Sequence, residues 1–238
     1  GTPSPLDAVV HLAAIASPQV CARDPGLAFR VNVQGTYNLL KLAVAAGAKK
    51  FIMASSAHLY GISPRYLPTD EQHPLQMVSD CYTCTKALGE DLCEKFHQIH
   101  GLSYCAIRLF NGYGSGQELG YFIPDKIAEA QQGKIVLNGG NITKDWVFVD
   151  DVVEAYVKAM ESKFVGAVNI GTGVETSLES IAQNIASAYK AELVTMGVQK
   201  PTRMQCDWTR ARNLLGWSPQ VNLLEGLQRT MRAVVEVP

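Results

Sequence analysis

Short apolar segments alternate with longer amphipathic segments over the first half of the chain. Residues 8–14, 49–56 and 103–110 are apolar runs of strand length, and each ends in small or polar residues. Residues 24–47 and 82–101 lie between these runs and have the apolar spacing of helices. Strands that alternate with helices are typical of right-handed parallel crossovers. The pattern therefore predicts an α/β fold built on a parallel sheet.

The pattern is looser in the second half of the chain. It predicts helices over 123–132, 152–160, 177–189 and much of 207–234, and strands over 134–137 and 166–171. Ser177 is a candidate N-cap. Asp150 and Asp151 are predicted to cap the helix that follows them, rather than to bind a metal, because carboxylates are favourable at a helix N-terminus.

Small and polar residues gather where the first three predicted strands end. Ligands of open parallel sheets bind beyond the carboxyl ends of the strands. The residues found there are Ala13, Ala14, Ser55, Ser56, Phe110 and Asn111. Because parallel strands end at the same edge of a sheet, we expect one site to gather these residues.

Tyr82 and Lys86 provide candidate acid–base chemistry for that site. They are four residues apart on the predicted helix after the second strand, so they share a face. An ammonium beside a phenol favours the phenolate, which makes a usable base of a group whose pKa is about 10. With Ser56 as a hydrogen-bonding hydroxyl, the pair could remove a proton from an alcohol while hydride leaves the same carbon.

The spacing of this pair occurs twice. Tyr37 and Lys41 are also four residues apart, but they lie in the middle of the first predicted helix, where the adjacent leucines indicate a packed face. Tyr82 instead begins a helix next to the predicted strand ends. The position favours Tyr82 and Lys86.

Composition limits the possible partners. The chain has 238 residues, of which 47% are hydrophobic and 18% charged, and its net charge of -1 gives no reason to expect nucleic acid or an anionic membrane as a partner. No apolar run approaches the roughly 20 residues that span a bilayer. The first residues lack the charged and apolar regions of a signal peptide. We therefore expect a cytoplasmic protein.

Some residues that resemble site residues have simpler interpretations. Cys81 and Cys84 form a Cys-x-x-Cys motif, which fits either a metal or redox site or a pair of reduced thiols. No second pair has zinc-finger spacing, so we expect reduced thiols and no metal. His11 ends a buried strand, and we expect it to be a hydrogen-bonded core residue rather than a catalyst.

Eight segments in register resemble the extended short-chain dehydrogenase/reductases, the nucleotide-sugar epimerase/dehydratase family. They are VVHLAA, NVQGTYNLL, SSAHLYG, YTCTK, IRLFNGYG, DWVFVDDVVEA, VNIGTG and ARNLLGWSP. The resemblance implies a Rossmann-like parallel sheet flanked by helices, with a smaller C-terminal substrate-binding lobe. It also implies NAD or NADP as the cofactor and a nucleotide sugar as the substrate.

The resemblance assigns roles position by position. It implies that Ser56, Tyr82 and Lys86 are catalytic, and that Tyr82 and Lys86 also contact the cofactor. The other implied cofactor contacts are Leu12, Ala13, Ala14, Asn32, Ser55 and Phe110. The implied substrate contacts are Ser56, His58, Asn111, Lys144 and Arg203. Lys144 and Arg203 are alternatives for contacting the diphosphate, or else solvated surface cations; His58 is either an auxiliary acid–base group or a structural residue.

The chain also departs from the pattern of this family. The glycine-rich phosphate fingerprint is absent, and Tyr113-Gly114-Ser115-Gly116 lacks the strand–turn–helix context to replace it. The chain begins at what resembles the fourth strand, so we expect an N-terminally incomplete fold. Residues 1–113, with 145–171, would form the dinucleotide-binding domain. Residues 114–144 and 172–238 would form the substrate-binding lobe.

Two further departures concern the site. Cys81 stands where proline is common before the tyrosine. Ala57 and His58 replace the acidic pair of the sugar dehydratases, which disfavours 4,6-dehydration. The sequence thus predicts an NAD(P)-dependent oxidoreductase or epimerase with a transient keto-sugar. A dehydratase or reductase, or a non-catalytic or truncated scaffold, remain alternatives. The resemblance also implies a homodimer paired through helices over 32–46 and 82–100.

Overall fold

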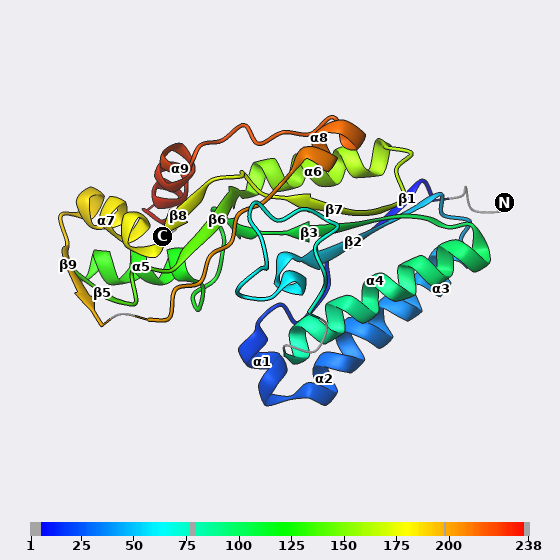
Figure 1. Cartoon of the computed structure of the whole chain (residues 1–238), viewed down its shortest axis with the longest axis horizontal. Coiled ribbons are helices and arrows are strands. Elements are labelled where there is room, and N and C mark those ends of the chain that lie inside the picture. Colours follow the sequence, from blue (N-terminus) through cyan, green and yellow to red (C-terminus); the bar gives the residue numbers. More distant parts are fainter. Residues whose placement is uncertain (1–5, 77–79, 198, 236–238) are drawn as a thin grey trace.

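A parallel sheet of four strands organises the right-hand part of the molecule in Figure 1. The computed structural model describes residues 6–76, 80–197 and 199–235. The strands lie in the order β1 (Ala8–His11), β2 (Lys50–Ser56), β3 (Ser103–Leu109) and β7 (Gly166–Ile170), and every pair is parallel. The predicted α/β fold with a parallel sheet is confirmed.

Helices cover both faces of this sheet (Figure 1). One face carries α1 (Pro18–Arg23), α2 (Pro25–Phe29), α3 (Gly35–Ala45) and α4 (Cys81–His100), and the other carries α6 (Val149–Glu161) and α8 (Thr209–Leu215). Side chains alternate between the two faces along each strand. Phe51 and Met53 therefore pack in the cluster of α3 and α4, whereas Ile52 packs in the cluster of α6 and α8.

The helix predicted over 24–47 consists of three segments in succession. Asp24 caps α2, because its Oδ1 accepts a hydrogen bond of 2.8 Å from the backbone N–H of Leu27. A π-helical segment, Arg30–Gln34, then joins α2 to α3 without a break. π-Helical turns inside α-helices occur frequently at functional sites, and this one contains Asn32.

α4 lies close to β2 because Gly89 has no side chain. A Cβ added at Gly89 would lie 2.2 Å from the Cε atom of Met53, which is in β2. Asp80 caps the start of the helix, where its two carboxylate oxygens accept hydrogen bonds of 2.8 Å each from the backbone N–H and the hydroxyl of Thr83. The helix therefore begins at the residue before Tyr82.

The remaining elements form a smaller region on the left of Figure 1. They comprise two further sheets, β4 (Asn111–Tyr113) with β6 (Thr143–Phe148) and β8 (Glu175–Ser177), and β5 (Lys134–Asn138) with β9 (Glu192–Met196), together with α5 (Phe122–Gln131), α7 (Leu178–Tyr189) and α9 (Leu223–Val235). The predicted cap of α7 is confirmed, since Ser177 Oγ accepts a hydrogen bond of 3.0 Å from the N–H of Ser180.

The C-terminal part of the chain contacts both regions. Residues of α8 and the buried Trp217 pack with Ile52 and Val168 of the parallel sheet, whereas Leu227 of α9 packs with α5 and α7. The segment after α7 thus returns to the sheet before it reaches the smaller region. In the part of the chain that the structure describes, no helix combines the length and the apolar character needed to cross a bilayer.

The predicted capping bond from Asp150 or Asp151 to α6 is wrong, although both carboxylates lie at the N-terminal end of the helix, where its macrodipole favours negative charge. Both residues lie within the first turn, and the N-cap residue, Phe148, makes no side-chain capping bond. The buried carboxylate of Asp151 instead accepts hydrogen bonds of 3.0–3.1 Å from the backbone N–H groups of Gln220 and Val221. Asp150 is exposed and pairs with Arg229. Asp151 therefore links the start of α6 to the backbone just before α9.

These neighbouring aspartates provide a matched test. Asp151→Ala leaves two backbone N–H groups without their acceptor, and we expect it to lower the free energy of unfolding by about 1–3 kcal/mol. Asp150→Ala removes an exposed ion pair and should cost only about 0–1 kcal/mol. Urea denaturation of both variants measures the difference. Equal losses would contradict the linking role of Asp151.

Candidate active site

Ser56, Tyr82 and Lys86 come together at the carboxyl end of β2. Ser56 is the last residue of β2, Tyr82 is the second residue of α4, and Lys86 is one turn further along the helix. All three are buried. The Ser56 hydroxyl lies near enough to the Tyr82 phenol to lower its pKa, and Lys86 Nζ lies 5.8 Å from the centroid of the Tyr82 ring. The close docking of α4 on β2 produces this arrangement.

Lys86 is an ammonium held in a buried position. Its Nζ donates a hydrogen bond of 2.9 Å to the carbonyl oxygen of Ala54 in β2. Burial lowers the pKa of Lys86 to about 8, because desolvation penalises the charged form. The negative potential of Glu90, one turn further along α4, acts in the opposite direction. An ammonium has three N–H donors, so two remain for a ligand.

The pKa of Tyr82 moves in the direction opposite to our expectation. We expected Lys86 to lower it, but burial of the phenol raises the pKa, and the nearby Ser56 hydroxyl only partly offsets this. The reason is that a phenolate would lose most of its hydration here, while the lysine ammonium is bonded to Ala54. In this structure Tyr82 is therefore a neutral phenol at physiological pH.

His58 lies beside Tyr82 in a 3₁₀ turn, Ala57–Tyr60, that follows β2. Its backbone N–H donates a hydrogen bond of 3.2 Å to Ser56 Oγ. Its ring meets the Tyr82 ring edge-on, with centroids 5.9 Å apart and an angle of 88°. Burial, and then the charge of Lys144, lower the pKa of His58. The imidazole is therefore neutral at pH 7.

The two candidate phosphate ligands differ in their availability. Lys144 of β6 is half-buried, has no hydrogen-bond or ion-pair partner among the described residues, and has a pKa lowered by burial. Arg203 is exposed and forms a two-pronged ion pair with Glu175, with 2.9 Å between Nε and Oε1. Glu175 also accepts a hydrogen bond of 2.6 Å from Thr143. Of these two cations, therefore, Lys144 is the one without an ion-pair partner among the described residues, and its charge acts on His58.

Asn32 holds the loop that follows β1. Its Oδ1 accepts a hydrogen bond of 2.8 Å from the N–H of Ile15, and its Nδ2 donates to the Ile15 carbonyl at 3.1 Å and to Thr85 Oγ1 at 3.0 Å. Both amide hydrogens are therefore used within the protein. Asn32 thus links the chain just after Leu12, Ala13 and Ala14 to α4. Its contact with a cofactor stays a prediction.

The loop itself is open to solvent. Leu12 is 60% exposed, and Ala13 is exposed as well, whereas Ala14 is half-buried. Just before them, His11 is buried and hydrogen-bonded through Nε2 to Thr36 Oγ1 at 2.8 Å, as expected of a core residue. The predicted loop residues therefore present backbone and small side chains at the sheet edge.

Phe110 and Asn111 follow β3 at the same edge. Phe110 is buried in a cluster with Tyr60 and Cys206. The Nδ2 group of Asn111 donates a hydrogen bond of 3.0 Å to the backbone carbonyl of Asp145, which lies next to Lys144. The side chain of Asn111 is half-buried. Its hydrogen bond ties Asn111 to the strand of Lys144, whereas Phe110 packs behind the turn that follows β2.

A buried polar network beneath the site was not predicted. Ser55, which we expected to bind cofactor, donates its hydroxyl hydrogen bond to Glu90. Arg108 binds the same carboxylate through two nitrogens, at 2.7 and 3.0 Å, and also donates to the Tyr60 hydroxyl at 3.0 Å. Tyr60 in turn donates to Asn169 at 2.6 Å. The sequence signal was an arginine inside an apolar strand, since a buried charge needs a partner.

The sequence matches the profile of the NAD-dependent epimerase/dehydratase family over residues 2–171. The chain belongs to this family. Among curated relatives, a UDP-glucose 4-epimerase of Mycolicibacterium smegmatis is 36% identical over 94% of the chain and 75% of the relative. A UDP-glucuronic acid decarboxylase of Arabidopsis thaliana is 31% identical over 93% of the chain and 68% of the relative.

Solved structures of this epimerase/dehydratase family have the same fold. The UDP-glucose 4-epimerase of Thermotoga maritima, solved with UDP-glucose, superposes with a TM-score of 0.89 and 32% identity over 97% of this chain and 77% of that one. The UDP-glucose 4-epimerase of Thermus thermophilus, solved with NAD, superposes with a TM-score of 0.89. It is 26% identical in sequence, over 98% of this chain and 79% of that one. The Rossmann-like fold predicted from the resemblance is confirmed.

The thiols and carboxylates of the described residues do not assemble a metal site. No group of three histidine, cysteine or acidic side chains with the arrangement of a metal site occurs within residues 6–76, 80–197 and 199–235. Cys81 and Cys84 are free thiols.

The burial of the charged Lys86 side chain is predicted to lower the stability of the folded protein at neutral pH. Between pH 8 and 10.5 the unfolded chain holds a proton that folded Lys86 has released, so the stability of the wild type rises with pH in this window. We expect Lys86→Met to raise the free energy of unfolding at pH 7 by about 1–3 kcal/mol. This difference from the wild type should shrink between pH 8 and 10.5.

Lys41→Met is the matched control, because exposed Lys41 lies over Tyr37 at 5.7 Å from its ring centroid, the same spacing on another helix. Its stability should follow that of the wild type at every pH. Chemical denaturation from pH 7 to 10.5 measures both variants. If Lys86→Met is less stable than the wild type at pH 7, the burial of the Lys86 ammonium does not destabilise the folded protein, and the prediction is contradicted.

Proposed function

We propose that this chain carries the proton-transfer machinery of an NAD(P)-dependent enzyme that oxidises, and most simply epimerises, a nucleotide-activated sugar through a transient keto-sugar. The observation that carries the proposal is the convergence of Ser56, Tyr82 and Lys86 at the carboxyl end of β2. The family is NAD-dependent, and its UDP-glucose 4-epimerases are similar over most of this chain.

The described residues fit the nicotinamide end of such a cofactor. Lys86 keeps two N–H donors free beyond the one bound to Ala54. The exposed loop of Leu12, Ala13 and Ala14, which Asn32 holds in place, would line the same end, and Phe110 would border it. Structural neighbours are solved with NAD and, in a Pseudomonas aeruginosa protein, with NADPH. The two cofactors are therefore equal candidates.

Tyr82 would accept the proton of a sugar hydroxyl at its phenol oxygen. Burial raises the pKa of Tyr82, so the phenol remains protonated until a positive charge approaches and stabilises the phenolate. Ser56, which lies near Tyr82, would hold the sugar oxygen in line. The nicotinamide, when bound, supplies the hydride acceptor. Proton transfer by a positioned group contributes roughly 10²–10⁴-fold to rate.

We assign the diphosphate of the substrate to Lys144 rather than to Arg203. Lys144 is half-buried, unpaired among the described residues and electrostatically coupled to His58. Arg203 could bind the diphosphate only after its ion pair with Glu175 is broken. A lysine binds phosphate as a point charge. Asn111 and His58 would then contact the sugar between Lys144 and Tyr82.

Epimerisation is favoured over dehydration by the residues that follow Ser56. Water elimination needs an acid and a base beside the tyrosine. Here Ala57 has no polar group, and the pKa of His58 is lowered by burial, so its imidazole is neutral and in edge-on contact with Tyr82. Return of hydride to the opposite face of a keto-sugar needs no additional base. The site therefore suits epimerisation.

We further propose how the chain is organised and where it acts. Among the described residues, 6–113 with 145–171 would hold the cofactor, and 114–144 with 172–235 the sugar nucleotide. The core clusters cross this division in both directions, because Trp146 and Phe148 pack with α5 and α7, whereas α8 and Trp217 pack on the parallel sheet. Six free cysteines suit the reducing cytoplasm. The pairing surface would be the outer side of α3 and α4, which run alongside each other in Figure 1.

Tyr82→Phe tests the proposed function directly. With UDP-glucose and added NAD or NADP, we expect turnover to fall at least 10²-fold because the proton acceptor is lost. Cofactor binding, measured by calorimetry, should persist. Tyr37→Phe is the matched control, since Tyr37 is 38% exposed on α3, and it should keep full turnover. Undiminished turnover in Tyr82→Phe, or a folded wild-type chain that binds neither cofactor, would contradict the proposal.

Leu42→Asp tests the pairing surface. Leu42 is 60% exposed on α3 and Ile99 is 71% exposed on α4, so a buried charge there should convert a dimer to a monomer in analytical ultracentrifugation. Leu214→Asp is the control, because Leu214 is 47% exposed on α8, on the opposite face of the sheet. A wild-type monomer, or a dimer that survives Leu42→Asp, would contradict this interface.

A further inference from the structure

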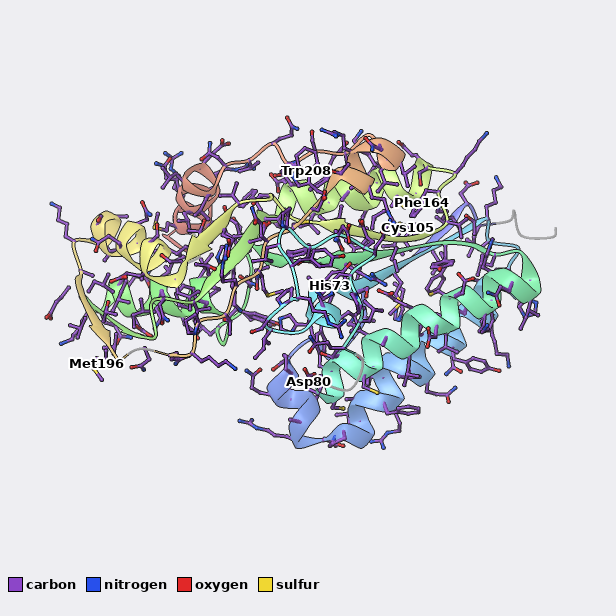
Figure 2. All side chains as sticks on the ribbon, in the orientation of Figure 1. His73, Asp80, Cys105, Phe164, Met196 and Trp208 are labelled. Carbon is purple, nitrogen blue, oxygen red and sulfur yellow. The ribbon has the colours of Figure 1, made fainter. Side chains whose placement is uncertain are left out.

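Two cysteines that the proposed reaction does not use flank Tyr82 at the start of α4. Cys81 is the first residue of this helix and Cys84 lies three residues further on. Both are half-buried free thiols. In Figure 2, the labelled Asp80 marks this end of α4, where the helix approaches α1. The pair therefore occupies the one helical turn that also carries the proposed catalytic phenol.

The other four cysteines have different surroundings. Cys21, Cys93, Cys105 and Cys206 are at most 2% exposed. Burial raises the pKa of each of them, in the case of Cys105 to about 12. The thiolate is the reactive form of cysteine, and a buried thiol in apolar surroundings is inert. Thiol reactivity is therefore concentrated at Cys81 and Cys84.

Helix geometry brings this pair within reach of a disulfide. Residues three apart on an α-helix have Cα atoms about 5 Å apart, which lies inside the disulfide range. Their Cβ atoms are about 5–6 Å apart on a regular helix, whereas a disulfide holds them at about 3.8 Å. Closure therefore requires the first turn to tighten.

This tightening acts on the bonds that define the first turn. The N–H of Cys84 donates a hydrogen bond of 3.0 Å to the carbonyl of Asp80, and the Asp80 carboxylate caps Thr83. Tyr82 lies inside the ring that the disulfide would close, and it packs with Cys21 and Cys81 in one cluster. A shift of this turn would move the phenol of Tyr82. Ser56 belongs to β2 in the sheet and would stay in place, so the distance between the two residues would change.

We propose that Cys81 and Cys84 are a redox-active dithiol, and that its oxidation to a disulfide switches off the chemistry at Tyr82. The loss of activity rests on the proposed function, whereas disulfide formation does not. The oxidant class is a hydroperoxide. One thiolate attacks a peroxide oxygen, the O–O bond breaks, and a sulfenic acid and water form; the second thiol then displaces water from the sulfenic sulfur. Two thiols and one hydrogen peroxide give one disulfide and two waters.

Cys21 is the competing partner within the same cluster. Its Sγ donates a hydrogen bond of 3.5 Å to the carbonyl of Ile15, and burial raises its pKa. It is thus held as a neutral thiol beneath the surface. Cys84 is half-buried and lies on the same turn as Cys81, so we assign the disulfide to Cys81 and Cys84.

The test oxidises the purified full chain with a few equivalents of hydrogen peroxide. We expect the number of free thiols to fall from six to four, the peptide that contains both residues to lose the mass of two hydrogens, and dithiothreitol to reverse both changes. Cys84→Ser and Cys81→Ser should not form this disulfide, and Cys21→Ala should still form it. Phenylarsine oxide, which bridges neighbouring thiols, should bind the wild type in a 1:1 ratio, at least 10-fold more tightly than it binds Cys84→Ser.

The activity arm uses UDP-glucose with NAD or NADP. Oxidised wild type should lose at least 10-fold of its turnover and recover on reduction, whereas Cys84→Ser should keep its turnover. A Cys21–Cys81 disulfide, oxidation to sulfinic acid without a disulfide, or an oxidised enzyme with full turnover would overturn the proposal. If the disulfide forms but Tyr82→Phe is fully active, the proposed function fails and the assigned switch fails with it, while the dithiol itself stands.

Discussion

The close docking of α4 on β2 is the contact on which the whole site depends. Gly89 favours it, because a Cβ there would lie 2.2 Å from the Cε atom of Met53, and that side chain would have to move. Two further links cross the same interface, namely the bond from Lys86 to the Ala54 carbonyl and the bond from Ser55 to Glu90. Each link joins the catalytic helix to the strand that ends in Ser56. The distance between Tyr82 and Ser56 is therefore a property of helix packing and not of a flexible loop.

This docking is achieved at an electrostatic cost. Burial lowers the pKa of Lys86 to about 8 and raises that of Tyr82, so both groups are held in surroundings that disfavour their charged forms. In the buried pair of Glu90 and Arg108 beneath them, each guanidinium nitrogen and each carboxylate oxygen makes a hydrogen bond, and a buried charge is tolerated only with such partners. The site is thus supported by a polar layer that contributes position rather than chemistry. Strain of this kind is common where activity requires it.

The first turn of the same helix is held by different contacts from those that hold its middle. The sheet and the apolar clusters hold the middle of α4, whereas its first turn is held by Asp80 and by contacts to α1 and α2. Tyr82 and the two half-buried thiols all lie in that turn. A covalent change at Cys81 and Cys84 would therefore act on the phenol and on the small buried cluster that it forms with Cys21 and Ala28.

The sequence alone predicted the alternating strands and helices, the strand-end residues, and the pairing of Tyr82 with Lys86, because hydrophobic period and i, i+4 spacing are local properties. It also separated Tyr82 from Tyr37 by position. It could not predict that the pKa of Tyr82 is raised, that Arg203 is paired with Glu175, or that Asp151 binds the backbone before α9. Each of these depends on residues that are far away in the chain. The links of Ser55 to Glu90 and of Asn32 to Ile15 are of the same kind. Residue types and their spacing are written in the sequence, but burial and hydrogen-bond partners arise only when distant segments pack together.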